Sequence, residues 1–130
     1  MTARHQDAAH AIAVAGLAGV FGYQGLVPKL WKTDPSEVAL WEACGVPRPR
    51  ATQIVRAVGA AEATFGIVTL ARRNQRWPFV VALAGMPAVA VAASVTDRSL
   101  VSKNFSPVPL GLAVVALAGV ALATSRAASP

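Results

Sequence analysis

The chain has 130 residues, of which 55% are hydrophobic and 14% are charged, and its formal net charge is +6. A soluble domain normally carries about 25% charged residues, so this composition argues against an ordinary soluble protein and indicates one integral membrane domain over residues 1–130. The basic residues lie at the ends of apolar runs and in short loops, not on a face interleaved with aromatic residues, so no nucleic-acid partner is expected. The single cysteine, Cys44, excludes an intrachain disulfide.

The first apolar run predicts a membrane span at about residues 10–28, after a polar tail over residues 1–9. Asp7 and the lack of a small-residue cleavage site indicate that this run is retained and is not a cleaved signal peptide. Tyr23 and Gln24 lie in the outer third of the span. Glycines recur in it every three residues, which offers a smooth face to a neighbouring helix, although glycine is also common in membrane helices generally: Gly16, Gly19, Gly22 and Gly25.

The polar connection over residues 33–50 contains a helix signature of its own. Asp34 can cap a helix, Pro35 suits the first helical position, and Glu37 completes a capping-box pattern. Gly45 and Pro47 would end that helix. We therefore expect a short interfacial helix between the first and second spans.

The second span is predicted at about residues 52–71 and carries Glu62 near its middle. A carboxyl group at that depth costs roughly 2.5–3.5 kcal/mol, so Glu62 should face protein or water and have a partner. Gly59 is the third residue before Glu62, so the two lie on one side of the helix, where a neighbouring helix can come close. Arg56 lies roughly 9 Å from Glu62 along the helix axis, so the two need not pair directly. The cation expected to pair with Glu62 is Lys29, whose long side chain can reach inward, or Arg56.

The third span is predicted at about residues 77–95, after a basic turn at 72–76, and Pro87 at its centre should kink the helix. That kink either opens space for a ligand or is a tolerated structural proline. The fourth span, at about 105–124, has no ionisable group and is expected to serve packing.

The expected fold class is all-α: a four-transmembrane-helix bundle with one short interfacial helix. Four spans place both termini on one side, and the concentration of arginines in the turn at 72–76 favours cytoplasmic termini. We expect a multi-pass protein of the plasma (inner) membrane.

Threading the spans up and down places Glu62 at the floor of a polar funnel lined by Tyr23, Gln24, Lys29 and Arg56. These five residues are the candidate ligand-binding residues. Glu62 either accepts a proton or orients a ligand, or it is a satisfied buried acid that fixes helix register. Because the sequence contains no metal-ligand spacing, haem-ligand pair, phosphate-binding glycine loop or nucleophile motif, we assign no metal and no catalytic residue.

Three segments together resemble the DoxX-like membrane proteins: Tyr23-Gln-Gly-Leu-Val-Pro-Lys-Leu-Trp31, Gly59-Ala-Ala-Glu62 with Gly66, and Phe105-Ser-Pro107. Their order and spacing cover nearly the whole chain. The resemblance implies four membrane helices and a quinone or redox partner, because the namesake is a small membrane subunit of a thiosulfate:quinone oxidoreductase. It carries over Gln24, Pro28, Lys29 and Glu62 as site candidates. The chain departs from the family pattern at Ser106 and near Gly111, where asparagines are usual.

The leading functional hypothesis is an accessory membrane subunit of a redox system that binds a quinone-like or other lipophilic ligand near Glu62. The chain has no redox centre of its own in this interpretation, so electrons come from a protein partner and catalysis by the chain alone is not expected. The alternative is a structural or assembly protein whose glycine- and alanine-rich faces pack on another membrane protein. A small transporter is less favoured, because the sequence shows one charged intramembrane residue and no inverted repeat.

Overall fold

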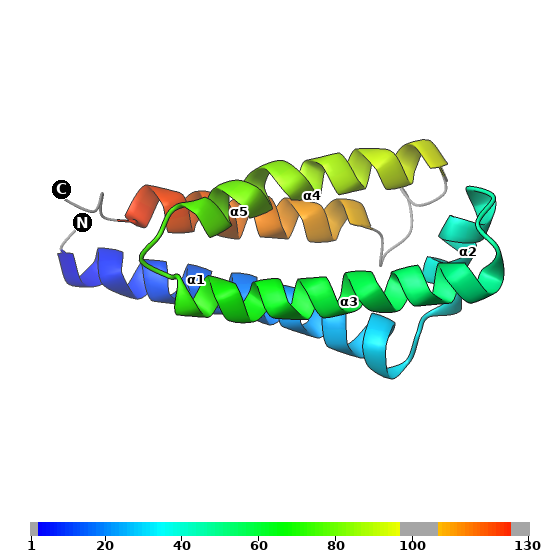
Figure 1. Cartoon of the computed structure of the whole chain (residues 1–130). Coiled ribbons are helices and arrows are strands. Elements are labelled where there is room, and N and C mark those ends of the chain that lie inside the picture. Colours follow the sequence, from blue (N-terminus) through cyan, green and yellow to red (C-terminus); the bar gives the residue numbers. More distant parts are fainter. Residues whose placement is uncertain (1–2, 97–106, 126–130) are drawn as a thin grey trace.

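The computed structural model describes residues 3–96 and 107–125, and within these segments the fold is all-α, as predicted. The helices are α1 (Ala3–Gly25), its π-helical continuation η1 (Leu26–Trp31), α2 (Pro35–Ala43), α3 (Arg48–Ala71), α4 (Trp77–Thr96) and α5 (Pro107–Thr124). Four of them are long and run side by side, and the short α2 lies across one end (Figure 1).

The long helices form two pairs that meet at α1. The most extensive helix–helix packing joins α1 to α3, α4 to α5 and α1 to α5. In contrast, α3 and α4 follow each other in sequence but touch only slightly. The start of α1 and the end of α5 lie at the same end of the bundle, opposite α2 (Figure 1).

The outer surface of the bundle is apolar. Large hydrophobic side chains on the outside include Ile12, Ile67, Val91, Val95 and Leu112, each more than half exposed. Among the described residues, the helices Ala3–Trp31, Arg48–Ala71 and Trp77–Thr96 are long and apolar enough to cross a membrane, and Val108–Thr124 is a shorter apolar helix. Such a surface would be an aggregation liability in water and suits lipid, so the fold is that of a multi-pass membrane protein.

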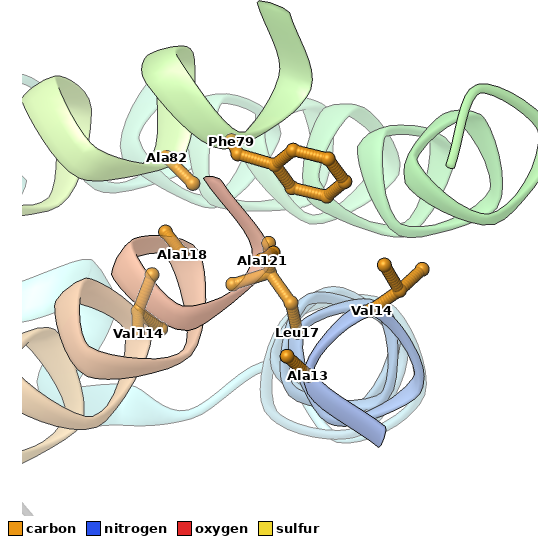
Figure 2. Packing of buried hydrophobic residues seen from close by; sticks show 8 residues of the cluster. All are labelled: Ala13, Val14, Leu17, Phe79, Ala82, Val114, Ala118 and Ala121. Carbon is orange, nitrogen blue, oxygen red and sulfur yellow. The ribbon is translucent and has the colours of Figure 1, made fainter. Parts of the chain in front are cut away.

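The main core lies where α1, α4 and α5 meet, towards the end of the bundle that carries the termini. Its largest members are Leu17 of α1, Phe79 of α4 and Val114 of α5, all fully buried (Figure 2). Small residues fill the rest, which lets the helices pack closely: Ala13, Val14, Ala82, Ala118 and Ala121. A second, smaller cluster fixes α2 on α3 through Val38, Ala51 and Val55.

Two expectations about local structure need correction. The segment expected to be a polar tail is helical from Ala3, because no glycine or proline interrupts the chain before Gly16. The capping box at α2 forms only in part. Asp34 caps the helix by accepting from the Ser36 N–H at 2.8 Å, but the Glu37 carboxylate lies beside Lys29.

Gly45 and Pro87 lie where the sequence places them, at the end of the short helix and inside the third long apolar segment. Gly45 has a φ of 84° and follows α2, as its predicted role in ending that helix requires. The helix α4 runs from Trp77 to Thr96 without interruption at Pro87. Phe105 and Ser106, at the expected start of the fourth span, lie outside the described residues.

Candidate functional site

The crossing of α1 and α3 depends on glycine. A Cβ atom built on Gly25 would lie 2.6 Å from the Ala63 nitrogen and would also collide with the Gly59 carbonyl oxygen. A Cβ atom on Gly59 would lie 2.5 Å from Lys29 Cβ and 2.8 Å from the Gly25 carbonyl oxygen. Real side chains cannot make such contacts, so glycine at both positions is what allows the two backbones to approach this closely.

A π-helical turn brings Lys29 into this crossing. Pro28 has no N–H, so it cannot form the usual helical hydrogen bond to the residue four positions before it. The helix widens here, and the Lys32 N–H donates to the Val27 carbonyl five residues back, at 3.0 Å. The wider turn leaves Lys29 packed against α3, with only 7% of the residue exposed. Single π turns in helices are frequently found at functional sites.

Lys29 and Glu62 form a close ion pair. Lys29 Nζ donates to both carboxylate oxygens of Glu62, each at 2.6 Å. The Lys29 side chain is 8% exposed and the Glu62 side chain is 25% exposed. Charge-assisted contacts of this kind are strong, and either charge left alone here would cost several kcal/mol. The intramembrane acid therefore has the partner that its depth requires, and that partner is Lys29.

A second carboxylate approaches the same lysine from α2. Glu37 Oε1 lies 3.8 Å from Lys29 Nζ, and the Glu37 side chain is 34% exposed. Burial raises the pKa of the Glu37 carboxyl above its usual value; Lys29 opposes this shift, whereas the Glu62 and Asp34 carboxylates add to it. The sequence had indicated Glu37 only as a capping residue. Its place in the site follows from the packing of α2 on α3, which brings Glu37 near Lys29, and no spacing in the sequence signals this.

The remaining candidate residues do not reach the ion pair. Arg56 is exposed, and it lies about 120° around α3 from Glu62, so the two side chains leave the helix on different sides. Tyr23 is 61% exposed and lies about 160° around α1 from Gly25, which faces α3. Gln24 is partly buried between these directions. None of these three side chains has a hydrogen-bond or ion-pair partner among the described residues. Of the five candidates, the structure brings Lys29 and Glu62 together, and Glu37 joins them.

A shallow apolar groove runs along α3 towards the start of α4. It has a volume of about 430 Å³ and is lined by Ala60, Ala61, Thr64, Phe65, Val68 and Trp77. Phe65 forms edge-on ring contacts with Trp77 at 6.5 Å and with Phe21 at 4.8 Å between centroids. Glu62 is not among the residues that line this groove, and Ala61, Thr64 and Val68 lie roughly 100–160° around α3 from it, so the groove opens on a different side of the helix from the carboxylate.

A second groove of about 460 Å³ separates α4 from α5. Pro87 contributes to it, together with Ser94, Gly111 and neighbouring apolar residues. No charged side chain lines this groove. The groove on α3 has no charged lining residue either, so both grooves suit the apolar part of a ligand.

At the opposite end of the bundle, His10 connects three elements. Its Nε2 lies 2.9 Å from the Arg73 carbonyl oxygen, and its Nδ1 lies 3.1 Å from the Ala121 carbonyl oxygen and 3.2 Å from Thr124 Oγ1. Its ring also packs edge-on against Phe79. His10 thus fastens α1 to the α3–α4 turn and to the end of α5, far from Glu62 along the helices.

Comparison with known proteins places this architecture in a family. The sequence model of the DoxX-like family matches residues 18–119. The match includes the glycine crossing, the π turn, Glu37 and the Lys29–Glu62 pair. No curated protein and no solved structure gives a significant match. Because the match extends over most of the chain, this integral membrane protein belongs to the DoxX-like family.

Proposed function

We propose that the chain is an accessory membrane subunit of a redox system, and that it holds the polar head of a quinone-like or other lipophilic ligand beside Glu62. The observation that carries this proposal is the asymmetry of the ion pair: Lys29 is almost fully enclosed, while a quarter of the Glu62 side chain stays open. A purely structural pair would be expected to be closed on both sides. Intramembrane acids of this kind commonly mark ligand or proton sites.

The chemistry of the pair suits a quinone head. A quinone carbonyl accepts hydrogen bonds and a hydroquinone hydroxyl donates them, and the ammonium and carboxylate supply one partner for each. The apolar groove lined by Ala61, Phe65 and Trp77 would hold the tail, and few contacts close the space between α3 and α4 on that side. Electrons would be supplied by a protein partner. The inner membrane, with cytoplasmic termini, is the location we propose for this assembly.

The experiment is copurification from native membranes in mild detergent, followed by extraction and mass spectrometry of bound lipophilic molecules. The wild type should retain a quinone in a reproducible ratio, and Glu62→Gln should lose it. Glu42→Gln is the control, because Glu42 is an acid of α2 that pairs with Arg48 away from the site. Equal ligand content in the wild type and Glu62→Gln would refute the proposal.

The second candidate function is structural, and the open faces of α1 favour it. A Cβ atom added at Gly19 or Gly22 would meet nothing within 4 Å, so small residues present a smooth surface to the outside. An assembly protein would use this surface to pack on another membrane protein, and Glu62 would fix helix register. A stoichiometric protein partner that is lost in Gly19→Leu but kept in Glu62→Gln would favour this function.

A further inference from the structure

Glu37, Lys29 and Glu62 form a cluster of two acids and one base, so it has one acid more than a neutral cluster would need. Lys29 Nζ contacts both oxygens of Glu62 at 2.6 Å and lies 3.8 Å from Glu37 Oε1. With all three groups ionised, the cluster carries a net charge of −1. The exposed fractions are 34% for the Glu37 side chain, 8% for Lys29 and 25% for Glu62. The excess charge can therefore be neutralised by one proton, and Glu37 is the more accessible acid.

We propose that Glu37 is the proton-exchanging group of this site, taking a proton from the aqueous side and supplying it through Lys29 to a ligand head held at Glu62. This inference rests on the proposed function and deepens it, because it assigns the route by which a reduced quinone would obtain its proton. In this arrangement α2 is part of the site and not only an interfacial anchor.

The transfer balances without any further reactant. An anionic oxygen on the reduced ligand takes a proton from the Lys29 ammonium, forming an O–H bond and leaving a neutral amine. The protonated Glu37 carboxyl then gives its proton to that amine, and its carboxylate takes up one proton from the aqueous phase, which is the proton that the ligand has gained. No electron moves in these steps, and the charge of the cluster is the same before and after.

The surroundings of Glu37 support this role. Burial raises the pKa of its carboxyl above the usual value, so Glu37 keeps a proton at a higher pH than a free glutamate would. The groups that face it are Lys29 from η1, Glu62 from α3 and Asp34 from its own helix. The described residues of α4 contain no titratable side chain.

The packing of α2 keeps Glu37 in place. Val38, the next residue, is 4% exposed and packs on Val55 and Ala51 of α3. Asp34 caps the same helix through the Ser36 N–H. Glu37 is thus fixed over Lys29 by a rigid turn of helix, which a group that exchanges protons with a buried lysine requires.

Glu42 provides a closely matched control. It lies on the same helix, its side chain is also 34% exposed, and it is 3.9 Å from a basic nitrogen, that of Arg48. The difference is that Arg48 is 70% exposed, so this pair is open to solvent and separate from the Lys29 cluster. Any effect that depends only on removing an acid from α2 should appear in both variants.

The experiment is an infrared pH titration of the ligand-free protein in lipid nanodiscs. We expect the wild type to retain a protonated-carboxyl band at a pH above the ordinary glutamate range, which is centred near about 4.3. The band should be absent in Glu37→Gln and unchanged in Glu42→Gln. In Glu62→Gln this band should disappear at a lower pH than in the wild type. The Lys29 ammonium is then free to pair with Glu37, and the negative charge of Glu62 is gone, and both changes lower the pKa of Glu37.

Three results would overturn the inference: a band that survives in Glu37→Gln, a band that is lost in Glu42→Gln, or a wild-type band that titrates in the ordinary range. Because no ligand is present, these results do not depend on the proposed function. If quinone copurifies with the wild type but the titration gives one of these three results, only the role of Glu37 is refuted. If the titration agrees with the prediction but no quinone is bound, the proposed ligand is refuted and the proton exchange at Glu37 is not.

Discussion

Gly25→Ala tests how the ion pair is held, because Gly25 sets the distance between α1 and α3. The new Cβ atom would lie 2.6 Å from the Ala63 nitrogen and would collide with the Gly59 carbonyl oxygen. Both obstacles are backbone atoms, which cannot rotate away. An unstrained contact needs about 3.5 Å, so the helices must separate by roughly 1 Å. Lys29 follows Gly25 by about one turn, so the same movement pulls it away from Glu62.

The expected change in the free energy of unfolding of Gly25→Ala is the sum of two opposing effects. Overpacking of a close contact costs up to about 3 kcal/mol, and the higher helix propensity of alanine returns about 1 kcal/mol, so we expect a net loss of about 2 kcal/mol. Gly19→Ala is the matched control in the same helix, because nothing lies within 4 Å of its added Cβ atom. Only the propensity effect applies there, so it should stabilise by up to about 1 kcal/mol.

The assay is reversible unfolding in mixed micelles with a rising fraction of a denaturing detergent, followed by tryptophan fluorescence. The free energy of unfolding should fall in Gly25→Ala and rise or stay level in Gly19→Ala. If Gly25→Ala is as stable as Gly19→Ala, the close glycine crossing does not hold the site together and the reasoning fails.

Three further predictions concern the charged and polar groups. Lys29→Met should destabilise the protein by about 3 kcal/mol in the same unfolding assay, because it leaves Glu37 and Glu62 without a cation. Glu62→Gln should destabilise it less, because Lys29 still has Glu37 as a partner. Equal losses in the two variants would argue against a lysine shared by both acids. His10→Phe should cost about 1–2 kcal/mol through its lost hydrogen bonds and leave ligand content unchanged; a loss of ligand would show that the two ends are coupled. Glu37→Gln should flatten the pH dependence of stability: with a raised folded-state pKa, Glu37 stabilises the fold below its unfolded pKa, and this contribution is lost as pH rises through the folded pKa. An unchanged pH profile would contradict the burial of Glu37.

The helices could be predicted from the sequence because their signals are local. Long apolar runs separated by basic or proline-containing turns indicate the long helices, and Asp34-Pro35 marks the start of α2. The requirement that Glu62 have a partner also followed from its depth alone. Such signals depend only on neighbouring residues, so they hold however the helices pack.

The identity of the partner could not be predicted in the same way, because it depends on the rotation of two helices about their axes. From the sequence, Arg56 and Lys29 are expected at comparable depths in the membrane. The glycine crossing and the π turn at Pro28 place Lys29, and not Arg56, beside Glu62. A π turn contains one residue more than an α-helical turn, and the spacing of apolar residues in the sequence does not reveal it. Glu37 was missed for a related reason: α2 packs on α3 and so brings Glu37 near Lys29, and that tertiary contact leaves no trace in local spacing.

The most direct measurement of the central claim is binding of a water-soluble short-chain quinone to the purified protein in nanodiscs. Trp77 lines the apolar groove on α3, so quenching of the Trp77 fluorescence, measured with Trp31 and Trp41 replaced by Phe in every protein, reports occupancy of that groove. We predict saturable quenching in the wild type and in Glu42→Gln, and a loss of saturable quenching in both Glu62→Gln and Lys29→Met. Saturable quenching of equal strength in all four proteins would contradict a ligand site at the Lys29–Glu62 pair.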